Sequence, residues 1–232
     1  MPAFGRLVAK DERDARYPAR AIMAPTPSER TYRYWNANGW WGDQGNLPHC
    51  VAYAWTHWLE DGPVTHPGPV PMVDPTEMYH LFQQNDEWEG EDYDGTSVRA
   101  GAKVLKSLGW IKEYRWATTL DDVIEAVLEH APVVLGINWY NTMSTPDDAG
   151  FIHVPPRAMF VGGHALVANG ANKKLGFARL KNSWGRPWGE KGFCFISFDD
   201  LARLIAEDGE ACLAVEVPTV KADTPPRADD GP

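Results

Sequence analysis

The sequence predicts an α+β fold with two lobes, a helical lobe followed by a β-rich one. Before Pro132, apolar residues recur at helical spacing in four segments, and most of these segments are bounded by a capping residue, a glycine or a proline. After Pro132 the apolar residues form short runs that are typical of strands. Because helices and strands are segregated along the chain, α+β architecture is favoured over an alternating parallel α/β sheet.

Four helices are expected in the first lobe. The clearest start is Asp74-Pro75-Thr76-Glu77, which carries an N-cap residue, a proline at the first helical position and an acid at the third. The expected helices run from about Cys50 to Asp61, from Asp74 through Phe82, from Gly95 to Gly109, and from Thr118 or Thr119 to just before Pro132.

The second lobe is expected to contain strands and one short helix, Asp199–Ala206. The expected strands are Val133–Tyr140, His164–Asn169, Phe177–Trp184, Gly192–Phe198 and Ala211–Val217. Residues 1–28 lack periodicity and predict an N-terminal arm, and the polar, proline-rich residues 221–232 predict a flexible tail. The helical lobe is therefore expected at 29–131 and the β-rich lobe at 132–220.

Composition limits the partners of the chain. The formal net charge of the 232 residues is −10, and the 22 Lys and Arg residues form no long run, so we expect no nucleic-acid partner. No apolar run is long enough to cross a bilayer, and the first residues lack the apolar segment of a signal peptide, so we expect no membrane partner and no secretion. The 11 tryptophans predict a core and a binding site rich in indole rings.

The three cysteines indicate a reducing, cytoplasmic location. Three cysteines leave at least one thiol free and cannot form a disulfide framework. A bridge between Cys194 and Cys212 stays open as an alternative. Cys194 alternates with Phe193 and Phe195, so we expect it to be packed within a strand.

The segment Asp43–Glu60 is the best candidate for the seat of a nucleophile. A loop containing glycine and proline delivers Cys50 to the first turn of an apolar-faced helix, and Gln44 lies six residues upstream. Unpaired N–H groups and the positive end of the helix dipole favour an anion there, so the pKa of the thiol is expected to fall. The amide of Gln44 is a candidate donor to an oxyanion.

The β-rich lobe offers the groups that such a nucleophile needs. His164 follows Gly162-Gly163 at the start of an apolar strand and is the candidate base. Asn182 is the candidate residue to orient the imidazole, and Trp184 the one to shield that contact from water. His153 is an alternative base, but its surroundings are typical of a loop. A metal site built from His49, Cys50 and His57 lacks suitable ligand spacing on one helix face.

These residues resemble the motifs of papain-like cysteine peptidases of the bacterial or phage type. The similarity rests on Gln44 with Cys50 six residues later, on Gly163-His164-Ala165-Leu166-Val167 and on Lys181-Asn182-Ser183-Trp184-Gly185, in the family's order. Asp94-Gly95-Thr96-Ser97 is similar to the family's loop before a helix that crosses the lobe. The resemblance implies a papain-like fold with an antiparallel, barrel-like β lobe and an active-site cleft between the lobes.

The resemblance also implies the chemistry. Cys50 is expected to be the nucleophile of an endopeptidase that forms a thioester, His164 the base and then the acid, Asn182 the orienting residue and Gln44 the oxyanion donor. The expected substrate is a peptide or protein, no metal or organic cofactor is expected, and the location is cytoplasmic or associated with a phage particle. His49, Gly95, Gly163 and Trp184 are expected to shape the site.

The chain departs from the family beside the nucleophile. Where the family has Cys-Gly-Ser-Cys-Trp, this chain has Leu47-Pro48-His49-Cys50-Val51, so the usual disulfide is absent and the loop is stiffer and bulkier. This loop, with the arm and tail, suits an alternative: a catalytically weak or inactive papain-fold scaffold or binding module in a larger assembly such as a virion. A cell-wall amidase shares the Cys/His chemistry but does not predict Asn182-Ser183-Trp184-Gly185. The residues identify no assembly partner or self-association surface.

Overall fold

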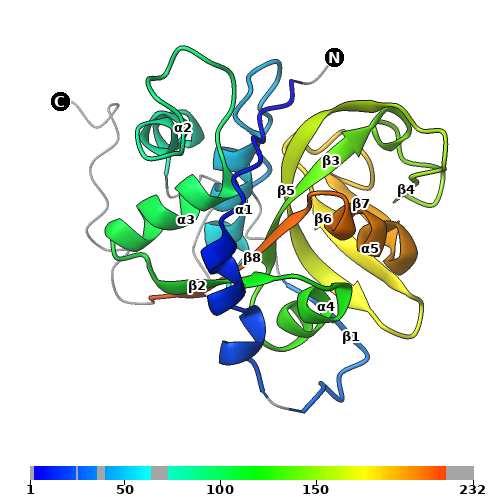
Figure 1. The fold of residues 1–232 in the computed structure, drawn as a ribbon. Helices are drawn as coiled ribbons and strands as arrows, with labels where there is room; N and C mark the ends of the chain where they lie inside the picture. Colours follow the sequence, from blue (N-terminus) through cyan, green and yellow to red (C-terminus); the bar gives the residue numbers. More distant parts are fainter. Residues whose placement is uncertain (1–2, 25, 36–39, 64–72, 218–232) are drawn as a thin grey trace.

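The computed structural model describes residues 3–24, 26–35, 40–63 and 73–217, and Figure 1 shows how their helices and strands are arranged. The tail expected at 221–232 lies outside the described residues. None of the helices in the described part of the chain is both long and apolar enough to cross a membrane.

The helices begin and end close to where the sequence predicts. Side chains cap four of the α-helices: Asp74 accepts from the Thr76 N–H, Ser97 from the Ala100 N–H, Thr119 from the Asp122 N–H, and Ser197 from the Asp200 N–H. The α-helices are α1 (Cys50–Asp61), α2 (Pro75–Gln83), α3 (Val98–Ser107), α4 (Leu120–Glu129) and α5 (Phe198–Ala206), and the 3-10 helices are η1 (Glu12–Arg16), η2 (Ala19–Ile22) and η3 (Asn141–Met143).

The strands form one sheet with the order β2-β8-β3-β5-β6-β7-β4, and β1 pairs with β5. Their bounds are β1 (Tyr32–Tyr34), β2 (Ile111–Ala117), β3 (Val133–Tyr140), β4 (Phe151–Ile152), β5 (Phe160–Asn172), β6 (Phe177–Lys181), β7 (Phe193–Ser197) and β8 (Glu210–Glu216). The five expected strands are thus present, with bounds that differ by a few residues.

The expected α+β fold is confirmed, but the sheet of the expected barrel-like lobe is not closed into a barrel. In the described residues β2 and β4 lie at the two ends of the sheet and do not pair with each other, so the sheet stays open. The pairing of β4 with β7 is also parallel. Strand β2 was not predicted, because it lies among the helices in the sequence. Its pairing with the distant β8 makes it part of the sheet.

Two apolar clusters cover opposite faces of the sheet. Alternate residues of a strand point to opposite faces, so Val134 and Val167 pack with α1, α2 and α3, whereas Leu135 and Leu166 pack with α4 and α5. Figure 1 shows α1 between the other helices of its cluster and β5. The expected tryptophan-rich core is present, since Trp55, Trp58 and Trp139 are fully buried. The first turn of α1 therefore lies against β5, where His164 is located.

Candidate active site

The loop before α1 and the segment after β6 are tied together by their backbones. The Gln44 N–H donates to the Ser183 carbonyl at 2.9 Å, and Asp43 forms a bridge with Trp184. The Ser183 hydroxyl also donates to Oε1 of Gln44 at 2.6 Å. These bonds bring the two sequence motifs, more than a hundred residues apart, into one site.

His164 and Asn182 are joined by a buried hydrogen bond. Nε2 of His164 lies 2.7 Å from Oδ1 of Asn182, and the Ser183 N–H donates to the same oxygen at 2.8 Å. Because Oδ1 accepts from Ser183, it is the oxygen that faces the imidazole, and Nε2 of His164 carries the proton. Nδ1 is buried and has no hydrogen-bond partner among the described residues. The imidazole therefore keeps one unshared basic nitrogen.

Aromatic rings enclose this imidazole. The ring centroids of Trp139 and Trp184 lie 4.8 Å and 5.0 Å from that of His164, and the ring of Phe4 meets it edge-on. Burial lowers the pKa of His164 from 6.5 to about 4, and the hydrogen bond with Asn182 only partly opposes this shift. His164 is therefore neutral at pH 7 in this conformation.

The N-terminal arm lies directly over these residues. Thr96 and Gly163 hold it through the backbone: the Thr96 N–H donates to Gly5 O at 2.9 Å, the Leu7 N–H to Thr96 O at 2.9 Å, and the Arg6 N–H to Gly163 O at 3.0 Å. Nε2 of Gln44 donates to the carbonyl oxygens of Ala3, at 3.0 Å, and Leu47, at 2.7 Å. The expected oxyanion donor is thus occupied by the arm.

Two of the expected site-shaping glycines make this close approach possible. A Cβ on Gly95 would lie 2.5 Å from Gly5 O, and a Cβ on Gly163 would lie 2.2 Å from Arg6 O. Gly95 also has a φ of +101°, which favours glycine. Gly5 itself is equally restricted, since its Cβ would lie 1.9 Å from Pro48 O. Gly95 and Gly163 therefore both contact the arm at positions without side chains.

Cys50 is the first residue of α1 and is completely buried under the arm. The sequence predicts a lowered thiol pKa, but the pKa of Cys50 is raised to about 11 in this conformation. Burial is the main cause, and hydrogen bonds from backbone groups of Ala165, Gly5 and Val51 only partly oppose it. The lowering of the thiol pKa that is expected at a helix N-terminus is therefore outweighed by burial in this conformation.

The remaining residues that the sequence singled out have other surroundings. His49 occupies the N-cap of α1 without capping it, and its ring stacks on Tyr79 at 3.9 Å. His153, the alternative base, is exposed and pairs with Asp147 at 2.8 Å. Cys194 and Cys212 are buried and free, so the bridge left open between them does not form. No group of three or more His, Cys, Asp or Glu side chains suited to a metal ion occurs in the described ranges.

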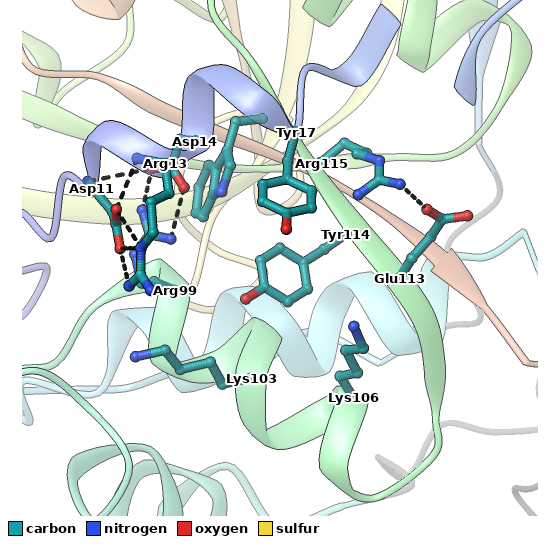
Figure 2. Close-up of a pocket in the computed structure, with 11 residues that line it drawn as sticks. Asp11, Arg13, Asp14, Tyr17, Arg99, Lys103, Lys106, Glu113, Tyr114 and Arg115 are labelled. Atoms are coloured by element: carbon teal, nitrogen blue, oxygen red, sulfur yellow. Dashed lines mark hydrogen bonds and ion pairs between the residues drawn. The ribbon is translucent and has the colours of Figure 1, made fainter. Parts of the chain in front are cut away.

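Charged residues anchor the arm beside the site. Arg99 of α3 donates from Nε to Ala9 O at 3.0 Å and from NH1 to Asp14 at 2.8 Å, and its guanidinium lies 4.8 Å from the Trp116 ring. Figure 2 shows Asp14 of η1 pointing towards Arg99 and the rings of Tyr17 and Tyr114 next to each other. These residues line a cavity of about 290 Å³. The sequence predicts an arm but not its path; glycines at the close contacts, such as Gly5, are a local signal for it.

The structure is similar to those of papain-like cysteine proteases. Its similarity to xylellain, a cysteine protease from Xylella fastidiosa, has a TM-score of 0.72, with 18% identity, and covers 93% of this chain and 97% of that one. For the bromelain protease from Ananas comosus, in complex with its inhibitor E-64, the TM-score is 0.57, the identity 13% and the coverage 81% and 100%. The chain therefore has the expected papain-like fold.

The sequence comparison shows the family. A family model described as papain family cysteine protease matches residues 73–208, which is more than half of the chain and includes His164 and Asn182. The chain belongs to this family. It is also 34% identical over 109 residues to an uncharacterized peptidase C1-like protein of Acanthamoeba polyphaga mimivirus. That match covers 44% of this chain and 35% of the viral protein, so the matched part of this chain spans about a third of that relative's length.

Proposed function

We propose that the chain is a cysteine endopeptidase in which Cys50 attacks a peptide carbonyl. Nδ1 of His164 takes the thiol proton as the sulfur bonds to the carbonyl carbon, and Nε2 of Gln44 donates to the oxyanion that forms. The same imidazole then protonates the leaving amine as the C–N bond breaks. Water, deprotonated by His164, hydrolyses the Cys50 thioester and releases the acid.

One observation carries this proposal: the hydrogen bond between Nε2 of His164 and Oδ1 of Asn182, from which we infer the tautomer of the imidazole. Asn182 accepts from Nε2 and leaves Nδ1 as an unprotonated nitrogen without a partner among the described residues. A base with a fixed tautomer, positioned by a neutral amide, is what proton transfer from a thiol requires. The amide of Gln44 already binds a carbonyl oxygen, that of Ala3, which supports its role as oxyanion donor.

The path of the arm supports cleavage within a chain rather than at its end. Hydrogen bonds to its main chain hold the arm from Ala3 to Leu7 across the site, and the chain continues past it to η1. The site therefore accommodates an extended polypeptide that runs from Gln44 to Thr96. In the present conformation the arm takes the place of substrate, so turnover requires it to leave.

The test is labelling and hydrolysis by the full chain. The inhibitor E-64, which bromelain binds, is expected to form one adduct on Cys50, as located by mass spectrometry. Cys50→Ala should abolish both the adduct and peptide hydrolysis, whereas the matched Cys194→Ala should retain both. Hydrolysis that survives in Cys50→Ala would disprove the assignment.

The buried thiol favours a second candidate, a papain-fold binding module in a larger assembly. With a Cys50 pKa of about 11 and a neutral His164, the covered site holds no thiolate–imidazolium pair. The two functions differ in what happens when the arm is released. If alkylation of Cys50 in an arm-released variant follows pH like free cysteine, the binding module is supported; fast alkylation that persists below the ordinary thiol pKa supports the peptidase.

A further inference from the structure

The arm carries a fully enclosed positive charge next to the candidate catalytic residues. The side chain of Arg6 is 0% exposed, and that of its partner Glu210 is 4% exposed. Nε of Arg6 donates to Oε2 of Glu210 at 3.0 Å, NH2 lies 2.9 Å from the same oxygen, and NH2 also donates to Asp208 O. Because a guanidinium loses its hydration on burial, it is stable there only with such acceptors.

The surroundings of this side chain are built into the sheet. Gly136 of β3 pairs with Ala165 of β5 on one side and with Glu210 of β8 on the other, so the three residues form one row across neighbouring strands. Paired residues point to the same face of a sheet. The row therefore has the Glu210 carboxylate at one end and Ala165, the neighbour of His164, at the other.

Gly136 provides the space between them. A Cβ at this position would lie 2.9 Å from Nε of Arg6 and 2.9 Å from Cγ2 of Val98 in α3. Any other residue would fill the room that the guanidinium uses. We call this place, formed by Val98, Gly136, Asp208 and Glu210, the Arg6 site.

The backbone bonds around Arg6 do not depend on its side chain. Thr96 binds the backbone of the residues on either side of Arg6, and Gly163 accepts from the Arg6 N–H. An extended peptide of any sequence can make such main-chain bonds, while the site for the side chain provides the selection. Gly163 directly precedes His164, so a residue held here lies next to the candidate reacting groups.

We propose that the Arg6 site, which the arm's own Arg6 occupies in this conformation, selects an arginine side chain in the peptide to be cleaved. This rests on the proposed peptidase function. Glu210 supplies the charge that discriminates between side chains, because an apolar or acidic residue would leave its buried carboxylate without a partner. Lysine fits less well, since a single ammonium cannot reproduce the paired contacts of a guanidinium.

Binding is tested first, in full-length chains that cannot turn over. The protein carries Gly5→Val, to displace the arm through the clash of its side chain with Pro48 O, Arg6→Ala, to empty the Arg6 site, and Cys50→Ala. The probe is a fluorescent peptide with the arm sequence Ala-Phe-Gly-Arg-Leu-Val, compared with a peptide in which neutral citrulline replaces arginine. We expect at least about tenfold tighter binding of the arginine peptide, because hydrogen bonds to charged groups are the stronger ones.

Two further variants of the same protein identify the source of the preference. Glu210→Gln should remove it, whereas the matched control Glu207→Gln should retain it, since the Glu207 carboxylate contacts Tyr140 and Arg203 instead. Equal binding of the arginine and citrulline peptides would overturn the proposal. A preference that survives Glu210→Gln would overturn it as well. The comparison of the two peptides changes only the ligand, so it stays decisive even if Glu210→Gln folds poorly.

Hydrolysis is tested in the chain that carries Gly5→Val and Arg6→Ala and retains Cys50, with quenched peptides that carry arginine, citrulline, leucine or glutamate at one position. The arginine peptide should have a kcat/KM at least about tenfold above the others. Hydrolysis without such a preference overturns the specificity proposal and leaves the peptidase proposal intact. Absence of hydrolysis for every peptide overturns the peptidase function and, with it, the role of the Arg6 site in cleavage.

Discussion

The side-chain Nε2 of Gln44 donates a 3.0 Å hydrogen bond to the carbonyl oxygen of Ala3. The amide expected to stabilise an oxyanion thus binds the backbone of the protein's own arm. Phe4, the next residue, meets the ring of His164 edge-on, and Gly5 lies against Pro48 beside Cys50. Substrate and arm therefore compete for one set of groups, and the predictions below follow from that competition.

Gly5→Val should release the arm. Its Cβ would collide with Pro48 O, and overpacking against backbone costs about 1–3 kcal/mol. We expect the rate of Cys50 labelling by a thiol-directed epoxide to rise about tenfold, as followed by mass spectrometry over time. Val8→Ala, which alters an exposed residue of the same arm, serves as the control. An unchanged rate in Gly5→Val would show that the arm does not limit access.

Asp14→Ala should loosen the anchor of the arm on α3. It removes the carboxylate that accepts from Arg99 (Figure 2), and Arg99 also binds Ala9 O. Trypsin should then cleave after Arg13 several times faster, since cleavage requires the arm to leave the body. The control is Glu12→Ala, at an exposed neighbouring position. If both variants are cleaved at the same rate, the Asp14–Arg99 pair does not hold the arm.

The free energy of unfolding should fall as the pH drops from about 6.5 to about 4. The unfolded chain protonates a histidine near pH 6.5, but burial lowers the pKa of His164 to about 4, so the folded chain binds that proton only at lower pH. This one group accounts for up to about 3 kcal/mol of the loss.

Urea denaturation at about pH 7 and about pH 4.5 checks this prediction, with His164→Gln for comparison. His57, whose pKa is also lowered by burial, contributes in both proteins, so the difference between them isolates His164. Parallel pH dependences in the two proteins would contradict a buried, neutral His164.

Lys181→Met should destabilise the fold by about 3–5 kcal/mol. The Lys181 ammonium lies 2.5 Å from Asp61 at the end of α1, and both side chains are fully buried. Removing one partner leaves an uncompensated buried charge. The double variant Asp61→Leu with Lys181→Met should recover most of the loss, as measured by urea denaturation. A double variant as unstable as the single one would mean that Asp61 is held mainly by Asn169, which donates to it at 2.8 Å.

Much of the fold followed from local sequence, because caps and apolar spacing act within a few residues. Asp74, Ser97 and Thr119 cap helices where the sequence predicts them. That the sheet stays open and that β2 belongs to it were not predicted, because the edges of a sheet are fixed by partners distant in sequence. The roles of Gln44, Cys50, His164 and Asn182 in catalysis remain predictions.

The sequence by itself determined which residue types stand in which order: a thiol at a helix start, an amide before it, and a histidine and an asparagine on later strands. Only the tertiary structure decided their state. It places Nε2 of His164 against Asn182, lays the arm over Cys50 and encloses Arg6 against Glu210. The physical reason is that pKa values and access depend on burial and on partners brought together from distant parts of the chain, which local sequence patterns do not specify.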